Sequence, residues 1–209
     1  MKVIYCAGEQ GKVVLDILRA SGDSDNVVFV DDDPSLHGRL ITDVPVIGGL
    51  DAISERSEET IQCLIAFGDQ PDVRLDLAED LSKFDSKFFN AIHPSSSISG
   101  KATLGYGVTV NGQSYIGPHC DISNHVIVDS CVNLSHDCAL REGATITPSV
   151  SLAGGVDIGR NSYIGPNATI VEDVTIGENV IVGAGSVVTE DVPSETTVVG
   201  VPASPTETE

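Results

Sequence analysis

Tryptophan is absent from this sequence and aromatic residues are scarce, because its 209 residues include only four tyrosines and five phenylalanines. Any core must therefore be filled by valine, isoleucine, leucine and alanine, and side chains of this kind favour β-strands. No apolar run approaches the roughly 18 residues that a membrane span requires. The chain also opens without the charged segment and cleavage site of a secretory signal, so we expect a cytoplasmic protein.

Basic residues are also few. Eleven Lys and Arg stand against 31 Asp and Glu, which gives a net charge of -20. Such an excess of carboxylates repels phosphate backbones and anionic lipids, and this argues against nucleic acid or a membrane as a partner. Because concentrated salt screens repulsion among carboxylates, the composition also favours a halophilic host.

The five cysteines form no recognisable framework. Their number is odd, and no C-x-x-C pair or similar metal-binding spacing occurs among Cys6, Cys63, Cys120, Cys131 and Cys138. This pattern argues against a disulfide or zinc scaffold. We expect buried, reduced thiols and no bound metal.

The first part of the chain alternates short apolar runs with segments of helical period, as in βαβ units with a small parallel sheet. The pattern predicts helices over 12–20 and 72–84, within an α/β domain over 1–91. In the second helix, one apolar stripe should face the sheet. The stripe consists of Val73, Leu77, Leu81 and Phe84.

From residue 92 to 209 the pattern changes to a repeat of six. A β-branched residue or leucine recurs at every sixth position, and a small or β-branched residue lies four positions after each. This period fits neither a helix nor a hairpin meander, but it is typical of a three-sided parallel β-helix with 18 residues per coil. Both series should point inward. The first comprises Ile98, Leu104, Val110, Ile116, Ile122, Val128, Leu134, Leu140, Ile146, Leu152, Ile158, Ile164, Ile170, Ile176, Val182 and Val188.

Three stretches resemble the hexapeptide-repeat acyltransferases, within them the sialic-acid O-acetyltransferase and UDP-amino-sugar N-acetyltransferase family. The resemblance implies a Rossmann-like nucleotide-sugar-binding domain followed by a left-handed β-helix, assembled as a homotrimer with active sites between neighbours. It also implies acetyl-CoA as co-substrate and a sugar acceptor, amine or hydroxyl, linked to a nucleotide. The stretches are VIYCAGEQGKVVLDIL, NLSHDCALREGATITPSVSLAGGVDIG and VIVGAGSVVTEDVPSETTVVGVPA.

The same resemblance assigns the catalytic roles. His136 corresponds to the general base of the family and Asp137 to its partner acid. An imidazole is suited to take the proton that an acceptor loses as it attacks a thioester. Gly154 lies 18 positions after His136, so one coil above it, and its backbone N–H is our candidate donor to the oxyanion.

Other interpretations of these residues remain open. His136 also fits a solvated corner position, and Asp137 stacks on His119 in the 18-residue register, where the two would form a surface ion pair. Some proteins with this helix bind zinc through three histidines, which draws attention to His119 and His125. Six residues apart, these two histidines fall on different sides of the helix and cannot share an ion within one subunit.

The implied cofactor contacts depart from the family pattern. Thr145 stands where relatives often carry a second histidine, and Ser204 where they usually place Lys or Arg near the CoA phosphates. After Ala102 the only basic residues are Arg141 and Arg160. This shortage favours the alternative of a non-catalytic nucleotide-sugar-binding or scaffold protein. The implied cofactor-binding residues are Thr145, Gly154, Gly155, Ala184 and Pro202.

The substrate contacts are implied in the first domain. Glycines bracket the turn from the first strand to the first helix, where N–H groups favour phosphate. Relatives often have a Gly-His pair where this chain has Glu9 and Gln10, and an acidic Glu9 is unfavourable beside a diphosphate. The implied substrate-binding residues are Gly8, Gln10, Gly11, Asp31, Asp32, Gly68 and Arg74.

Overall fold

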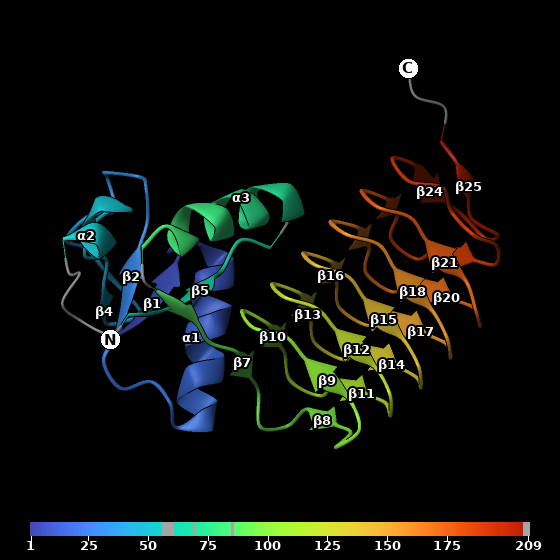
Figure 1. Ribbon diagram of the computed structural model, residues 1–209, viewed down its shortest axis with the longest axis horizontal. Coiled ribbons are helices and arrows are strands. Elements are labelled where there is room, and N and C mark those ends of the chain that lie inside the picture. Colours follow the sequence, from blue (N-terminus) through green and yellow to red (C-terminus); the bar gives the residue numbers. More distant parts are fainter. Residues whose placement is uncertain (56–60, 69, 85, 207–209) are drawn as a thin grey trace. The chain divides into compact units, whose positions relative to one another are not determined.

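The protein was analysed as a computed structural model, which describes residues 1–55, 61–68, 70–84 and 86–206. Two compact units divide the chain, Met1–Pro94 and Ser95–Glu209. The first is an α/β unit and the second a parallel β-helix, so the predicted fold class is confirmed (Figure 1). None of the described helices combines the length and the hydrophobicity that a bilayer crossing requires.

The first unit is built around a parallel sheet in the order β2-β1-β5-β6. Val3 pairs with Val28 on one side and with Cys63 on the other, which places β1 in the middle of the sheet. A short antiparallel pair, β3 with β4, lies apart from this sheet. The elements are β1 (Lys2–Tyr5), α1 (Glu9–Ser21), β2 (Val27–Val30), β3 (Leu40–Ile41), β4 (Val44–Pro45), α2 (Asp51–Ser54), β5 (Gln62–Ile65), α3 (Pro71–Ser82), β6 (Lys87–Phe88) and β7 (Ala91–Ile92).

Helices cover both faces of this sheet, because strand side chains alternate between the faces. Ile4 packs with Leu15 and Leu18 of α1 in one cluster. Tyr5 packs in the other cluster, which includes Leu81 of α3. Both helices were predicted, within three residues at each end.

The predicted stripe on α3 is only partly correct. Leu81 is buried, but Val73, Leu77 and Phe84 are partly exposed. Leu77 and Phe84 nevertheless pack against the core cluster that contains Leu81, and the buried positions of the helix also include Arg74, Leu75 and Ala78. Because one of these buried positions is an arginine, the spacing of apolar residues alone did not predict it.

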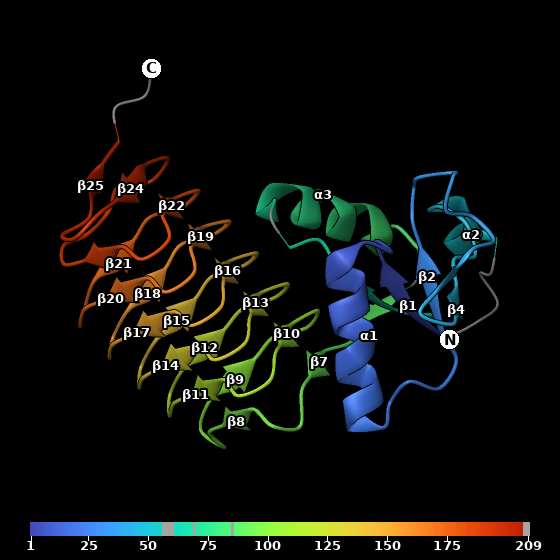
Figure 2. The same cartoon turned by 180° about the vertical axis from the view of Figure 1, so that it is seen from behind.

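The second unit has three sides whose strands stack in register every 18 residues as far as β23, after which β24 pairs with β22 at a spacing of 16 (Figures 1 and 2). Thr109 pairs with Ile127, which pairs with Thr145, and the other sides repeat this spacing. One side contains β8 (Ser97–Ile98), β11 (Tyr115–Ile116), β14 (Asn133–Leu134), β17 (Ser151–Leu152), β20 (Thr169–Ile170) and β23 (Val187–Val188). The next contains β9 (Thr103–Leu104), β12 (Asp121–Ile122), β15 (Ala139–Leu140), β18 (Asp157–Ile158) and β21 (Thr175–Ile176). The third contains β10 (Thr109–Val110), β13 (Ile127–Val128), β16 (Thr145–Ile146), β19 (Tyr163–Ile164), β22 (Ile181–Val182), β24 (Thr197–Val199) and the antiparallel β25 (Ser204–Pro205).

The interior of the β-helix follows the six-residue repeat. From Val110 onward every aliphatic residue of the first series is buried, whereas Ile98 and Leu104 at the start are partly exposed. The second series is buried from Val108 onward, and its serines pair their hydroxyls with the backbone. The hydroxyl of Ser162, for example, donates to the carbonyl oxygen of Gly177 at 2.7 Å.

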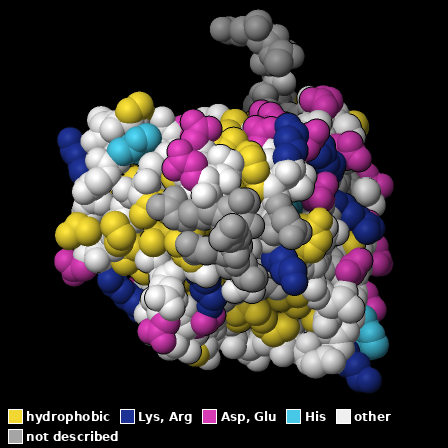
Figure 3. All heavy atoms as spheres, turned by 60° about the vertical axis from the view of Figure 1, so that its left-hand side comes forward, with side chains coloured by type: hydrophobic (Ala, Val, Ile, Leu, Met, Phe, Trp, Pro, Cys, Tyr) yellow, Lys and Arg dark blue, Asp and Glu magenta, His cyan; other side chains and the backbone are white. Residues whose placement is uncertain are grey.

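Apart from the buried Arg74, most charged side chains of the described residues lie at the surface. Figure 3 shows Asp and Glu at the surface of one face, intermixed with Lys and Arg. Local ion pairs are exposed, such as Lys83 with Asp80 at 2.6 Å. Exposed pairs of this kind contribute little to stability, so packing of the aliphatic interior must hold the coils together.

Replacing one interior side chain tests this account. Ile146 is completely buried, and Ile146→Ala should lower the free energy of unfolding by about 2–5 kcal/mol because it leaves a cavity between coils. Urea denaturation of the whole protein measures this change. Asn133→Ala, on an exposed position of β14, is the control and should change little. A loss below about 1 kcal/mol for Ile146→Ala contradicts the packing.

Candidate active site

His136 and Asp137 lie in the turn between β14 and β15. The Nδ1 atom of His136 is 2.8 Å from Oδ2 of Asp137, and the two side chains are 62% and 60% exposed. The sequence left two partners open for the carboxylate of Asp137, namely His136 and His119. In the structure this carboxylate pairs with His136.

The contact with Asp137 sets the tautomer of the ring. A carboxylate accepts hydrogen bonds only, so the Nδ1–H of His136 donates and its Nε2 is left with a lone pair. A general base needs a nitrogen atom with such a lone pair to accept a proton. The pair is therefore oriented for proton abstraction at Nε2.

The next coil supplies two glycines to the same corner. We call the His136 corner the stack of turns formed by Pro118-His119, His136-Asp137, Gly154-Gly155 and Glu172-Asp173. Backbone bonds join the turns: the N–H of Gly155 donates to His136 O at 3.0 Å, and that of Asp173 to Gly154 O at 3.0 Å. Within the described residues, the N–H of Gly154 donates to no acceptor.

The imidazole of His136 lies directly against Gly154. A Cβ added to Gly154 would meet Cε1 of His136 at 2.4 Å and Nε2 at 2.7 Å. Any side chain at position 154 would thus displace the ring. The sequence placed Gly154 above His136 from the coil length alone, and the structure brings the two into contact.

The histidines of the metal interpretation lie apart. His119 is exposed at the His136 corner, while His125 is 3% exposed at another corner with its ring edge-on to Tyr106, 5.3 Å between centroids. Over the described ranges, no group of three or more His, Cys, Asp and Glu side chains is placed to hold a metal ion.

The two arginines of the β-helix are occupied by carboxylates. Nε of Arg160 is 3.4 Å from Oε2 of Glu142, which confirms the predicted pair. Nε of Arg141 is 2.9 Å from Oδ1 of Asp157, and the second nitrogen also contacts this carboxylate. The guanidinium groups are consequently engaged within the chain.

Three of the implied cofactor contacts lie away from the His136 corner. Thr145 is buried on β16, Ala184 is exposed in the turn after β22, and Pro202 is exposed in the turn before β25. Within one chain, the structure brings only Gly154 and Gly155 next to His136.

A second candidate region lies at the carboxyl ends of the neighbouring strands β1 and β5, because the chain leaves β1 toward β2 and leaves β5 toward β6 on the opposite side of the sheet. Ligands bind open α/β sheets at such switch points. Gly8 precedes α1 and leaves open space before the helix N-terminus, while Gly11 lets the helix approach the carbonyl oxygen of Cys6. Glu9 is 91% exposed and pairs with Lys12 at 2.6 Å, so its charge is turned to solvent and partly neutralised.

Asp31 and Asp32 lie at the end of β2, beside this turn. Oδ2 of Asp31 accepts the N–H of Ala7 at 2.7 Å, which ties the two loops together. Oδ2 of Asp32 accepts the hydroxyl of Tyr5 at 2.6 Å. Burial, followed by this hydrogen bond, raises the pKa of Tyr5, so the phenol stays protonated. Both aspartates therefore have structural roles as well as positions at the candidate site.

Gly68 and Arg74 lie after β5, next to Gln10. A Cβ on Gly68 would lie 3.6 Å from Oε1 of Gln10, and the Nε2 atom of Gln10 is buried with no hydrogen-bond partner in the described chain. Arg74 is 1% exposed and donates to the carbonyl oxygen of Phe67 at 2.6 Å. Burial lowers the pKa of its guanidinium to about 10. Arg74 holds the loop rather than presenting its charge to solvent.

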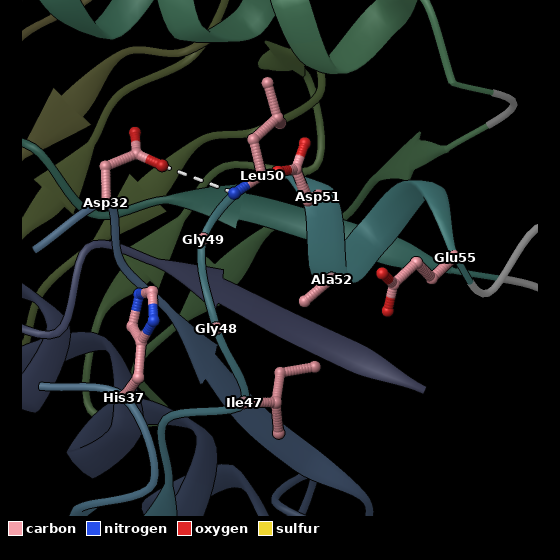
Figure 4. A pocket seen from close by; sticks show the side chains of 9 residues that line it. All are labelled: Asp32, His37, Ile47, Gly48, Gly49, Leu50, Asp51, Ala52 and Glu55. Atoms are coloured by element: carbon pink, nitrogen blue, oxygen red, sulfur yellow. Dashed lines mark hydrogen bonds between the residues drawn. The ribbon is translucent and has the colours of Figure 1, made fainter. Parts of the chain in front are cut away.

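Sequence reasoning missed a pocket beside Asp32. It measures about 500 Å³ and is lined by His37 and by the segment that leads into α2 (Figure 4). Oδ1 of Asp32 accepts the N–H of Leu50 at 3.3 Å, which joins this segment to the end of β2. A Cβ on Gly49 would lie 3.0 Å from that oxygen. The adjacent glycines Gly48 and Gly49 were the only sequence signal for it.

Two parts of the chain match described protein families. Residues 155–190 match the bacterial transferase hexapeptide family, defined by six repeats, and residues 3–81 match the PglD N-terminal domain. No curated protein matches the chain significantly by sequence alone.

Solved structures match the chain over nearly its whole length. The acetyltransferase domain of PglB from Neisseria gonorrhoeae is 30% identical with a TM-score of 0.92, and 98% of each chain is covered. PerB from Caulobacter crescentus, in complex with CoA and GDP-perosamine, is 34% identical with a TM-score of 0.92, covering 99% of this chain and 97% of PerB. The Neisseria domain has also been solved in complex with acetyl coenzyme A.

An α/β unit followed by a hexapeptide-repeat β-helix is the architecture of a class of acyltransferases. The chain belongs to the hexapeptide-repeat acyltransferases of the left-handed β-helix type, in the family of sialic-acid O-acetyltransferases and UDP-amino-sugar N-acetyltransferases.

The contact between His136 and Gly154 can be tested directly. Gly154→Ala should push the imidazole away and lengthen the 2.8 Å contact with Asp137, because the new Cβ and the ring cannot occupy the same space. A crystal structure of the variant measures the displacement. Gly100→Ala is the control, since nothing lies within 4 Å of that position. A ring that keeps its place in Gly154→Ala contradicts the geometry.

Proposed function

We propose that this protein is an acetyl-CoA-dependent acetyltransferase that acts on the amine or hydroxyl group of a nucleotide-linked sugar. PerB binds CoA and GDP-perosamine, and the acetyltransferase domain of PglB binds acetyl coenzyme A. The observation that carries the proposal is the His136 imidazole, oriented through Nδ1 by Asp137 and lying against Gly154. In this assignment, residues 1–91 bind the nucleotide sugar and residues 92–209 transfer the acetyl group.

His136 acts as the general base. Its Nε2 takes the proton of the acceptor as the new bond to the acetyl carbon forms and the bond from that carbon to sulfur breaks. Asp137 stabilises the resulting imidazolium through Nδ1. The imidazolium then returns the proton to the departing thiolate, so protons and charge balance over one turnover.

Gly154 stabilises the charge that develops on the thioester oxygen. Its N–H donates to nothing in the described chain, and the Cα side of the residue faces the ring of His136. A fixed backbone donor next to the base is the arrangement that lowers the barrier to acyl transfer. Thr145, Gly155, Ala184 and Pro202 are proposed to contact acetyl-CoA. Because three of these lie away from the His136 corner, the proposal includes a homotrimer with sites between copies.

The nucleotide would bind at the switch point of the first unit. Gly8 and the N–H groups that open α1 suit a diphosphate, and Lys12 partly offsets the charge of Glu9. The buried Nε2 of Gln10 is a donor without a partner in the described chain, so a phosphate oxygen could accept from it. The pocket beside Asp32 has room for a base or ribose. Gly11, Asp31, Gly68 and Arg74 would shape this site rather than bind directly.

A non-catalytic nucleotide-sugar-binding or scaffold protein is the second candidate. The observation that favours it is the engagement of Arg141 and Arg160 by carboxylates, which leaves the β-helix without a spare arginine for the CoA phosphates.

The cytoplasmic location and the halophilic host remain predictions from the composition of the sequence.

The role of His136 leads to the first functional test. His136→Ala should reduce turnover of acetyl-CoA with the acceptor by at least about a hundredfold, because the acceptor then loses its base. Steady-state assays of released CoA thiol measure this, and an unchanged melting temperature shows that the fold is intact. His119→Ala, one coil below at the same corner, is the matched control and should retain activity. Full turnover by His136→Ala contradicts the proposed mechanism.

Ligand-induced stabilisation separates the two candidate functions. A ligand at 100 times its dissociation constant should stabilise the protein by about 2.7 kcal/mol. Thermal melts would be run with acetyl-CoA, UDP-sugars and GDP-sugars, each in dilute and in molar salt. The transferase account predicts a shift with acetyl-CoA that is larger in molar salt, because screening reduces repulsion between its phosphates and the carboxylates. A shift with nucleotide sugars and none with acetyl-CoA favours the scaffold.

A further inference from the structure

A few positions of the second series in the β-helix carry a donor group in place of an aliphatic side chain. Four of these side chains make the same contact, because each donates to the carbonyl oxygen of the residue 15 positions later. Ser114 donates to Asp129 O at 2.6 Å, Cys120 to Ser135 O at 2.9 Å, Cys138 to Ala153 O at 3.2 Å and Ser162 to Gly177 O at 2.7 Å. A buried hydroxyl or thiol thus holds one backbone carbonyl oxygen in the interior.

Two of the four donors belong to the His136 corner. The second-series residues that follow the turns of this corner are Cys120, Cys138, Val156 and Val174. Only the two thiols among them can donate a hydrogen bond, and their acceptors are the residues immediately before His136 and Gly154. The donors therefore occur where the proposed base and the proposed oxyanion donor begin, and the coils above have valine instead.

The acceptor of Cys138 belongs to the same peptide unit as the N–H of Gly154. A peptide unit is planar and trans, so its C=O and N–H point in opposite directions. Cys138 is 1% exposed, and its thiol binds the carbonyl oxygen of Ala153 from the interior of the helix. The N–H of Gly154 must then point outward, where it donates to no acceptor within the described residues.

The equivalent unit at Ser162 shows what is different at Gly154. The hydroxyl of Ser162 holds the carbonyl oxygen of Gly177, and the N–H of Glu178 in that unit points outward. This N–H donates to Oγ of Ser194 at 3.0 Å, so it is already used. The N–H of Gly154 is held in the same way but is not used within the described chain.

Cys138 is the group that fixes the carbonyl of Ala153. Over the described ranges, no backbone N–H donates to this oxygen, and the thiol lies nearer to it than to His136 O, at 3.2 against 3.7 Å. Contact with the thiol of Cys120, followed by burial, raises the pKa of Cys138, so the S–H keeps the proton that it donates. A hydrogen bond to a carbonyl also polarises its peptide unit and strengthens the N–H as a donor.

We propose that Cys138 is a positioning residue for acyl transfer, whose thiol fixes the peptide unit between Ala153 and Gly154 so that the N–H of Gly154 faces the oxyanion. This inference rests on the proposed acetyltransferase function. Cys138 touches neither substrate and acts only through the backbone. Because charge on the thioester oxygen develops in the transition state, loss of this alignment lowers kcat and leaves the binding of both substrates nearly unchanged.

Alanine and serine at position 138 compare side chains of similar size without and with a donor. Cys138→Ala should lower kcat by about five- to tenfold, while the KM for acetyl-CoA and for the acceptor changes by less than about twofold. Cys138→Ser keeps a donor like those of Ser114 and Ser162 and should restore kcat to within about twofold of the wild type. The acceptor is one that the wild type acetylates, chosen from a panel of UDP-linked and GDP-linked sugars.

Ser162→Ala is the matched control. It removes the same kind of interior bond from a peptide unit that has no proposed part in the reaction, so kcat should change by less than about twofold. The fold should tolerate both alanine variants, because Ala144 and Ala168 occupy equivalent buried positions on other coils. Melting temperatures measure whether the two variants lose similar stability.

The pH dependence of kcat/KM separates an effect on Gly154 from an effect on His136. The ionisation of the base sets the midpoint of this profile. Cys138→Ala should keep the wild-type midpoint, because the contact between His136 and Asp137 is untouched. A shifted midpoint would mean that Cys138 acts through the base, and this would overturn the inference.

The remaining outcomes distinguish this inference from the proposed function. If His136→Ala abolishes turnover but Cys138→Ala keeps the wild-type kcat, the role of Cys138 is wrong and the transferase stands. The role is also wrong if Cys138→Ser is as slow as Cys138→Ala, or if Ser162→Ala is slowed equally. A wild-type protein that neither binds acetyl-CoA nor acetylates any acceptor contradicts the proposed function, and the inference falls with it.

Discussion

The exact register of the stacked coils is the constraint on which the rest of the structure depends. From β8 to β23 each strand residue lies above the residue 18 positions earlier, as the pairing of Asn133 with Ser151 shows, whereas in the last coil Thr197 pairs with Ile181 at a spacing of 16. Aliphatic side chains at every sixth position fill the interior and fix this register, because a slip of one residue would turn them outward. The register therefore also decides which groups meet on the outside of the helix. His136, Gly154 and the turn above them are neighbours for this reason alone.

In the α/β unit, the order of the strands in the sheet decides which loops lie together. Its sheet order places β1 between β2 and β5, so the loops that follow these strands gather at one edge. Helix α1 begins at that edge, and the carboxylates of Asp31 and Asp32 tie the loops to Ala7, Tyr5 and Leu50. The site residues implied by the sequence in this unit are thus partly structural. The helix N-terminus and the neighbouring pocket are the parts of this unit that we propose for nucleotide binding.

Much of this could be predicted from the sequence because the repeat is periodic. The six-residue spacing predicted the three-sided helix, the position of Gly154 above His136 and the pair of Arg160 with Glu142, since each follows from the coil length alone. Features that depend on side-chain direction could not be predicted. The buried face of α3 includes Arg74, and Asp173 reaches down to Gly155. The pocket beside Asp32 likewise arises from a loop without regular spacing.

A crystal structure of the protein with bound acetyl-CoA tests the central claim most directly. The account predicts the thioester oxygen within hydrogen-bond reach, about 3 Å, of the Gly154 N–H, and the acetyl carbon beside the free Nε2 of His136. The pantetheine arm should run between two copies of the β-helix. Acetyl-CoA bound away from the His136 corner, or a His136 ring enclosed where no thioester can reach it, would contradict the account.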